Sequence, residues 1–252
     1  LATGAAASAA GPPLASASAS GPPLASGPWG SRDPVADPSS VVTAGAARFT
    51  VLTDRVIRME YDPQEAFEDR ATMAIINRKL PAVSFQQGND GTALTISTAS
   101  LKLTYVLGQG FAEEGALAIE SVDASSTFAS WAFGQADPGN LLGTIRTLDG
   151  EDMPTLNCTL VRSRMNNQCG WDDSDCQCEW GVVGREGWAL VDDSANYALS
   201  DESDFWDGPN VDAVDLYFFG HGHDYKGALK DFVAVGGSVA LPPRHAVGVW
   251  FT

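Results

Sequence analysis

Basic side chains and long apolar runs are both scarce in this sequence of 252 residues. Lys and Arg together number 15 against 32 Asp and Glu, which gives a formal net charge of −17 at pH 7. Because such an anionic surface repels phosphates, we expect no nucleic-acid partner. No run of about 18 apolar residues occurs, so no segment is predicted to cross a bilayer and no membrane partner is expected.

Cysteine is also rare, and all four cysteines fall within one short region: Cys158, Cys169, Cys176 and Cys178. Their C-x10-C-x6-C-x-C spacing differs from the paired C-x2-C pattern of structural zinc sites. We therefore expect no metal site here and no cofactor. Disulfides that staple a long loop are the interpretation for an oxidising compartment, and free thiols are the interpretation for a reducing one. The sequence leaves both open.

Composition divides the chain near residue 42. Residues 1–42 are almost entirely Ala, Gly, Pro and Ser, and the segment GPPLASASAS from Gly11 is followed by GPPLASGPWG from Gly21. Such a stretch buries too little apolar area to offset the entropy lost on ordering. We predict a disordered leader over 1–42. It lacks the basic and apolar regions of a signal peptide, so the cellular location is not determined.

Residues 43–240 predict an all-β domain, because apolar and polar residues alternate in short runs. Arg48 to Thr53 and Ile57 to Tyr61 read as a hairpin with a turn at Thr53-Asp54, and Gly88-Asn89-Asp90-Gly91 marks a second turn. Further period-two runs follow, with apolar residues at Leu94, Ile96, Leu101, Leu103, Tyr105 and Leu107. Gly187 to Val191 and Val214 to Phe219 are largely apolar on both faces, as expected for strands between two layers.

One segment is predicted to be helical. Tyr225, Ala228, Leu229 and Phe232 recur at helical spacing, and Gly236-Gly237 supplies a stop. Beyond it, residues 241–252 comprise a proline-stiffened connection and an apolar strand without a partner. We expect these residues to be a linker and the first strand of a truncated second domain.

Five motifs together resemble glycoside hydrolase family 31, the α-glucosidase family. They are FEDRATMAIINR, NLLGTIRTLDG, CEWGVVGREGWALVDDS, DLYFFGHGHDYKGALK and LPPRHAVGVW, which occur in this order between Phe67 and Trp250. The resemblance covers about 43 to 252. It implies a galactose-mutarotase-like β-sandwich with one short helix, followed by the start of a (β/α)8 barrel.

In that family the barrel supplies both carboxylates of a retaining hydrolysis, which lie roughly 5 Å apart. Both belong to later barrel strands, and no residue of this chain matches either. We therefore expect a non-catalytic N-terminal domain that braces the missing catalytic barrel and lines a cleft for an α-glucoside or oligosaccharide. A secretory or lumenal location suits such an enzyme. The alternative is a stand-alone carbohydrate-binding or interaction module without catalysis.

The resemblance also implies that a loop of this domain reaches the substrate. It places that loop between the turn ending at Gly150 and Trp180, where Asp149 is the first candidate for a bond to sugar hydroxyls. The loop also contains Asp152, Asp172, Asp173 and Asp175. Alternatively, Asp149 caps a turn, since Asp before Gly is common there.

Phe205-Trp206-Asp207-Gly208 is a second candidate contact for sugar. An aromatic ring can stack on the apolar face of a pyranose while a neighbouring carboxylate, here Asp207, bonds its hydroxyls. The alternative is a hairpin tip with Trp206 packed beneath it.

His221-Gly222-His223-Asp224 has the donor types of a metal site. The family motif instead predicts a tight turn whose His and Asp side chains bond backbone amides at a helix start. Sugar epimerisation by His221 and His223 is disfavoured, because both lie on one turn and fold alone confers no activity.

Overall fold

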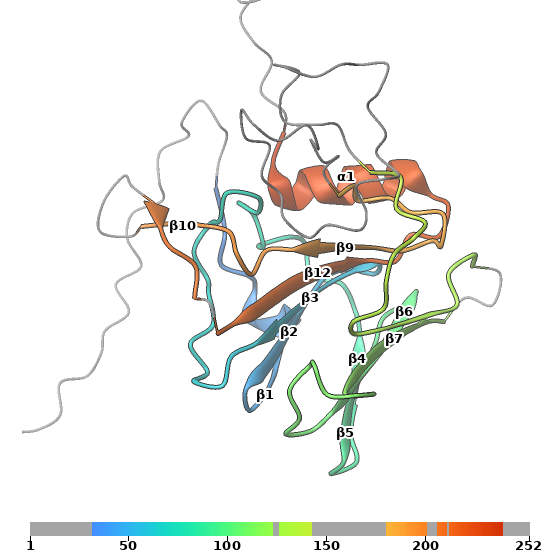
Figure 1. Ribbon diagram of the computed structural model, residues 1–252, viewed down its shortest axis with the longest axis horizontal. Helices are drawn as coiled ribbons and strands as arrows, with labels where there is room; N and C mark the ends of the chain where they lie inside the picture. Colours follow the sequence, from blue (N-terminus) through green and yellow to red (C-terminus); the bar gives the residue numbers. More distant parts are fainter. Residues whose placement is uncertain (1–31, 123–125, 143–179, 201–205, 211, 239–252) are drawn as a thin grey trace, which may run out of the picture.

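The computed structural model describes residues 32–122, 126–142, 180–200, 206–210 and 212–238. Within these ranges the chain forms two five-stranded sheets, a two-stranded hairpin and one α-helix (Figure 1). The predicted all-β sandwich with one short helix is confirmed. No helix in the described ranges has the length and apolarity to span a membrane.

The first sheet has the strand order β1-β2-β3-β12-β9, and each neighbouring pair is antiparallel. The predicted hairpin forms its centre, because β2 and β3 are joined by a tight turn in which Thr53 pairs with Val56. Its strands are β1 (Val41–Ala44), β2 (Ala47–Thr53), β3 (Val56–Tyr61), β9 (Ala189–Asp192) and β12 (Val214–Phe219).

The second sheet is an antiparallel meander in chain order, β4-β5-β6-β7-β8. The turn predicted at 88–91 lies at its first hairpin, although Gly88 and Asn89 still belong to a strand. Its strands are β4 (Gln86–Asn89), β5 (Ala93–Ser97), β6 (Leu101–Val106), β7 (Leu117–Ser121) and β8 (Ser130–Ala132). Strands β10 (Ala198–Leu199) and β11 (Trp206–Asp207) make the separate hairpin.

The main core lies between the two large sheets. Alternate residues of each strand point into it, so apolar side chains of β2, β3 and β12 meet those of β5, β6 and β7. Phe218 of β12 is central, with ring centroids 5.5 Å from Phe128, 5.3 Å from Trp131 and 6.3 Å from Trp188. This aromatic group holds the sandwich together.

Helix α1 (Tyr225–Gly236) covers the outer face of the first sheet, on the side away from the second sheet (Figure 1). Val235 and Phe232 of the helix pack there against Tyr217 and Phe219 of β12. Burial on both faces explains why Val214 to Phe219 is apolar except at Asp215.

The helix ends as predicted, since Gly237 with φ of 87° caps it. One residue of the predicted apolar stripe differs. Leu229 is 50% exposed, whereas Ala228 and Val235 are buried. Asp231 is turned toward Thr53, whose hydroxyl donates to it at 2.8 Å.

The leader predicted over 1–42 is too long at its C-terminal end. Residues 38–40 form a 3-10 helix, η1 (Pro38–Ser40), and β1 begins at Val41. Asp33 bridges to Asn77, and the Asp33 carbonyl accepts bonds from Arg78 and Lys79 amides. These backbone bonds compensate for the apolar area that the segment lacks. Residues 1–31 and the linker and strand predicted over 241–252 lie outside the described residues.

Candidate functional site

The turn between β12 and α1 carries the His-Gly-His-Asp segment. Gly222 adopts φ of 58°, which favours glycine, and its amide donates to Gly187 O at 2.8 Å. Asp224 is the N-cap, since its Oδ1 accepts from the Gly227 amide at 3.0 Å. The predicted capping role is confirmed for Asp224.

The predicted amide bonds of the two histidines are wrong. His221 Nε2 lies 2.9 Å from Oδ2 of Asp231, a residue of α1. The hydroxyl of Thr53 donates to the same oxygen at 2.8 Å. Burial by itself raises the pKa of Asp231, but the bonds from His221 and Thr53 outweigh it and lower the pKa. Asp231 of the helix therefore joins the β2–β3 hairpin through Thr53 and the preceding turn through His221.

His223 has a different partner, because its Nε2 lies 2.9 Å from Arg185 O. Together with the bond between Gly222 and Gly187, this contact fastens the segment before β9 to the turn. The two imidazoles thus point to separate neighbours. Among the described residues, no group of three or more His, Cys, Asp or Glu has the arrangement of a metal site.

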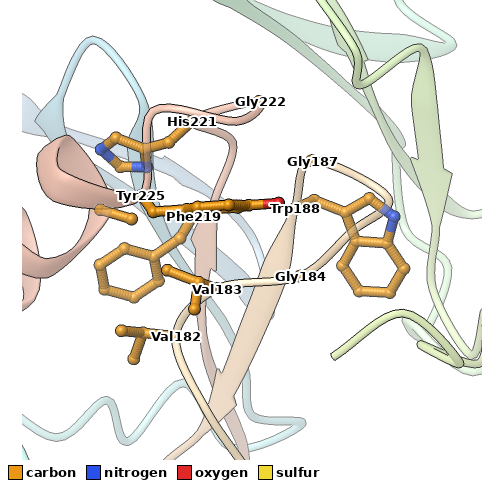
Figure 2. Close-up of a pocket in the computed structure, with 10 residues that line it drawn as sticks. Val182, Val183, Gly184, Gly187, Trp188, Phe219, His221, Gly222 and Tyr225 are labelled. Carbon is orange, nitrogen blue, oxygen red and sulfur yellow. The ribbon is translucent and has the colours of Figure 1, made fainter. Parts of the chain in front are cut away.

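A shallow depression lies beside this turn, lined by residues that include Val182, Gly184, Phe219, His221 and Tyr225 (Figure 2). It measures about 150 Å³ including solvent at its mouth. His221 Nδ1, beside this depression, is buried without a hydrogen-bond partner among the described residues.

The outer face of the first sheet also carries a buried ionic cluster. Arg58 is 1% exposed, and its Nε and Nη2 donate to the two Asp215 oxygens at 2.8 and 2.6 Å. Arg58 Nη2 lies 3.0 Å from Glu60 Oε1, and Arg48 donates to both oxygens of Glu60 at 2.7 and 2.8 Å. Burial opposes the charge on Arg58, but Asp215 and Glu60 outweigh it and hold its pKa well above the ordinary value.

A second buried group adjoins this cluster. Arg78 Nε donates to the Tyr217 hydroxyl at 2.6 Å, and Arg78 Nη2 lies 4.0 Å from Asp193. The Thr72 hydroxyl donates to Asp193 at 2.7 Å. Burial raises the pKa of Asp193 to about 6 despite the bond from Asn196, and burial also raises the pKa of Tyr217. Sequence reasoning missed both groups, although charges within otherwise apolar strands were a signal.

The hairpin β10–β11 presents the candidate sugar-binding pair. Trp206 lies opposite Leu199 and is 45% exposed, so it is not packed beneath a turn. Asp207 lies opposite Ala198, and its carboxylate forms a salt bridge with Arg70. Arg70 also bonds Glu68 at 2.7 Å. The structure therefore leaves the indole accessible and engages the carboxylate within the protein.

The remaining predicted site residues are Asp149 and the cysteines Cys158, Cys169, Cys176 and Cys178. All of them lie outside the described residues. Their positions relative to Trp206 are therefore not described. Their predicted roles in substrate binding and in disulfides stay predictions.

No family model matches the chain, and no curated protein matches it. Similar solved structures include two of the GH31 dextranase of Flavobacterium johnsoniae. The first, a mutant complexed with isomaltotriose, is 14% identical with a TM-score of 0.45 and covers 82% of this chain. The second, complexed with glucose, is 13% identical with a TM-score of 0.44 and also covers 82%. This chain spans 28% of the dextranase chain in both matches.

Proposed function

We propose that this chain is the N-terminal β-sandwich of a glycoside hydrolase of family 31, with its work on α-glucosides done by a barrel beyond it. One observation carries the proposal. Three motifs that resemble the family, far apart in sequence, meet in one buried polar group. Thr72 and Arg78 come from FEDRATMAIINR, Asp193 from CEWGVVGREGWALVDDS, and Tyr217 from DLYFFGHGHDYKGALK.

The contacts of these residues indicate what the motifs do. Arg78 also donates to the carbonyls of Pro34 and Arg70, at 3.3 and 2.8 Å, so a single guanidinium joins four segments. Arg78 Nη2 is buried without a hydrogen-bond partner among the described residues, but the other polar atoms named here bond one another or the backbone. Buried groups that bond one another in this way serve architecture. A domain of this kind gives rigid support to the neighbouring domain that carries out catalysis.

Hydrolysis itself is assigned to carboxylates outside this chain. A retaining mechanism needs two of them flanking one glycosidic bond. Three of the buried carboxylates among the described residues, Asp193, Asp215 and Glu60, face protein partners on the outer side of the first sheet. They are ion-pair and hydrogen-bond partners, and a sugar has no access to them.

The experiment compares the 252-residue chain with the product of the reading frame extended past Thr252. Both are assayed on maltose, isomaltose and an aryl α-glucoside. We expect turnover from the extended protein alone. Turnover by the 252-residue chain above a heat-denatured blank contradicts the proposal, and so does an extended protein that is folded yet inactive on every α-glucoside.

The extended protein also tests Asp149. If its carboxylate bonds sugar hydroxyls, Asp149→Asn raises KM about tenfold and changes kcat less, as for a lost substrate contact of about 1.4 kcal/mol. Asp192→Asn, at an exposed position outside that loop, is the matched control. Parent-like kinetics of Asp149→Asn would remove Asp149 from the site and leave it as a turn residue.

A further inference from the structure

The hairpin β10–β11 extends into a small three-stranded arrangement that the proposed function does not use. Thr72 forms an antiparallel bridge with Ala198, and backbone bonds join Met73 N to Tyr197 O and Leu199 N to Ala71 O, at 3.0 and 2.7 Å. The hairpin is thereby anchored to the segment before the Arg78 group. In Figure 1, β10 lies to the left of the first sheet, away from α1.

Strand register places the exposed aromatic residues on one face of this arrangement. Trp206 pairs with Leu199, and Tyr197 stands two residues before Leu199, so all three side chains share a face. Tyr197 and Trp206 are diagonal neighbours across the two strands, a distance that aromatic side chains can span. Ala198 points the other way and is buried.

This face is uncovered. Tyr197 is 50% exposed, Trp206 45% and Met73 63%. Continuing the register places Gly208 opposite Tyr197, and a Cβ built at Gly208 meets nothing within 4 Å. The residue across from the tyrosine ring therefore contributes no side chain that hides it.

Ionic contacts hold the aromatic strand in place. Asp207, next to Trp206 in the strand, forms a salt bridge with Arg70. Arg70 in turn donates two further hydrogen bonds to the Glu68 carboxylate, at 2.8 and 2.7 Å. Bonds to Glu68 raise the pKa of Arg70, so the guanidinium stays charged at any working pH. Asp207 thus positions the hairpin, and its predicted direct contact with sugar stays a prediction.

We propose that Tyr197 and Trp206, with Met73 beside them, form a platform that binds a neutral carbohydrate chain. Pyranose rings have an apolar face that stacks on aromatic rings and a hydroxyl rim that bonds polar groups such as the Tyr197 hydroxyl and the Trp206 indole N–H. The platform acts in binding and takes no part in bond cleavage. The proposal rests on the proposed function only in its choice of an α-glucan as the first probe.

Charge and size select this partner over others. With a formal net charge of −17, the protein repels nucleic acids and acidic polysaccharides, while a neutral glycan meets no such barrier. Stable protein–protein interfaces bury about 1,200–2,000 Å² in total. Three exposed side chains are too few for such an interface, and they suit a few sugar rings.

Calorimetry with the 252-residue chain tests the platform, using maltodextrin as the probe and alginate as an anionic comparison. We expect maltodextrin to bind and alginate not to bind. Trp206→Ala and Tyr197→Ala should each weaken binding about tenfold, as for the loss of one stacked ring. Trp206→Phe and Tyr197→Phe keep a ring and should retain most of the affinity. These two variants separate stacking from any unfolding of the hairpin.

Trp180→Ala is the matched control, because Trp180 is 57% exposed and lies in a different segment. It should bind like the parent chain. Equal affinity of parent and Trp206→Ala, or no binding of maltodextrin or of a neutral β-glucan, overturns the platform. A parent dimer in sedimentation that Trp206→Ala dissociates also overturns it, since a second copy then covers the face. Binding of β-glucan alone sustains the platform and counts against the α-glucoside function.

Discussion

Arg58 lies in an environment that is unusual for an arginine. It is buried between two carboxylates in the middle of a sheet, where desolvation of each charge costs several kcal/mol. The carboxylates and the Glu68 carbonyl, at 2.7 Å, offset that cost. The cluster is stable only while every member is present.

Replacing Arg58 should therefore destabilise the fold strongly. We expect Arg58→Met to lower the free energy of unfolding by about 3–5 kcal/mol, because Asp215 and Glu60 lose their buried counter-charge. Urea denaturation measures the change. Lys102→Met is the matched control, since Lys102 and Glu120 form an exposed pair at 3.7 Å that contributes about 0–1 kcal/mol. Equal losses in the two variants would contradict a buried cluster.

Asp193 predicts a pH dependence of stability. Its pKa rises from 3.8 to about 6 in the folded protein, so between these values the folded state binds the proton more tightly than the unfolded chain. Stability from this group is present below the unfolded pKa and is lost as pH rises through the folded pKa. Arg78 and Asp215 face the same carboxyl and enter this shift with opposite signs.

The Asp193→Asn variant isolates that contribution. Relative to the variant, the parent chain should lose up to about 3 kcal/mol of unfolding free energy between about pH 4 and about pH 7. Denaturation at both pH values measures it. Asp192→Asn, at an exposed neighbouring site, is the control. A parent-to-variant difference that is the same at both pH values would show that Asp193 titrates normally.

At the scale of elements, the Asp224 cap of α1 requires a residue without a side chain at position 227. A Cβ at Gly227 would lie 2.8 Å from Asp224 Cγ, so the helix accepts glycine in its first turn to keep the cap. Alanine ordinarily stabilises a helix relative to glycine by about 1 kcal/mol. Here that gain competes with displacement of Asp224.

A double-mutant cycle tests this competition. Asp224→Ala should cost about 1 kcal/mol, the usual value of an N-cap. Gly227→Ala should destabilise the parent chain and stabilise the Asp224→Ala chain, with coupling of about 1–2 kcal/mol. Urea unfolding of the four proteins gives the cycle. Stabilisation by Gly227→Ala in both backgrounds would mean that the cap tolerates a methyl group.

At the same scale, local pattern predicted the β2–β3 hairpin, the β5–β6 alternation and the two ends of α1. These features depend on residues close in sequence, such as Gly237 at the helix end. Local pattern failed for Leu229, and for the histidine contacts, because partners from other segments decide those positions. Asp231 turns inward since Thr53 and His221 meet it there.

At the scale of the whole molecule, the sandwich depends on contacts between its two sheets. Phe218 comes from β12, and Trp131 comes from β8 in the other sheet, with ring centroids 5.3 Å apart. Both side chains are almost completely buried. Contacts within this aromatic group thus couple the stability of one sheet to that of the other.

Phe218→Ala should cost about 3–5 kcal/mol of unfolding free energy, from lost burial and from the cavity left between the sheets. Phe232→Ala removes the same ring from the half-buried helix face and should cost less. Chemical denaturation and thermal melting compare the two. A larger loss for Phe232→Ala would place the main stabilising contacts under α1.

The sequence by itself determined the alternating strands, the single amphipathic helix with its Asp224 cap, and the resemblance of its motifs to a glycosidase family. Each follows from residues that are neighbours along the chain. Only the tertiary structure decided that β12 lies between β3 and β9, which joins Arg58 to Asp215. It likewise decided that Arg70 engages Asp207 and leaves Trp206 exposed. Pairing across long sequence separations depends on the packing of all layers at once, and no local pattern encodes it.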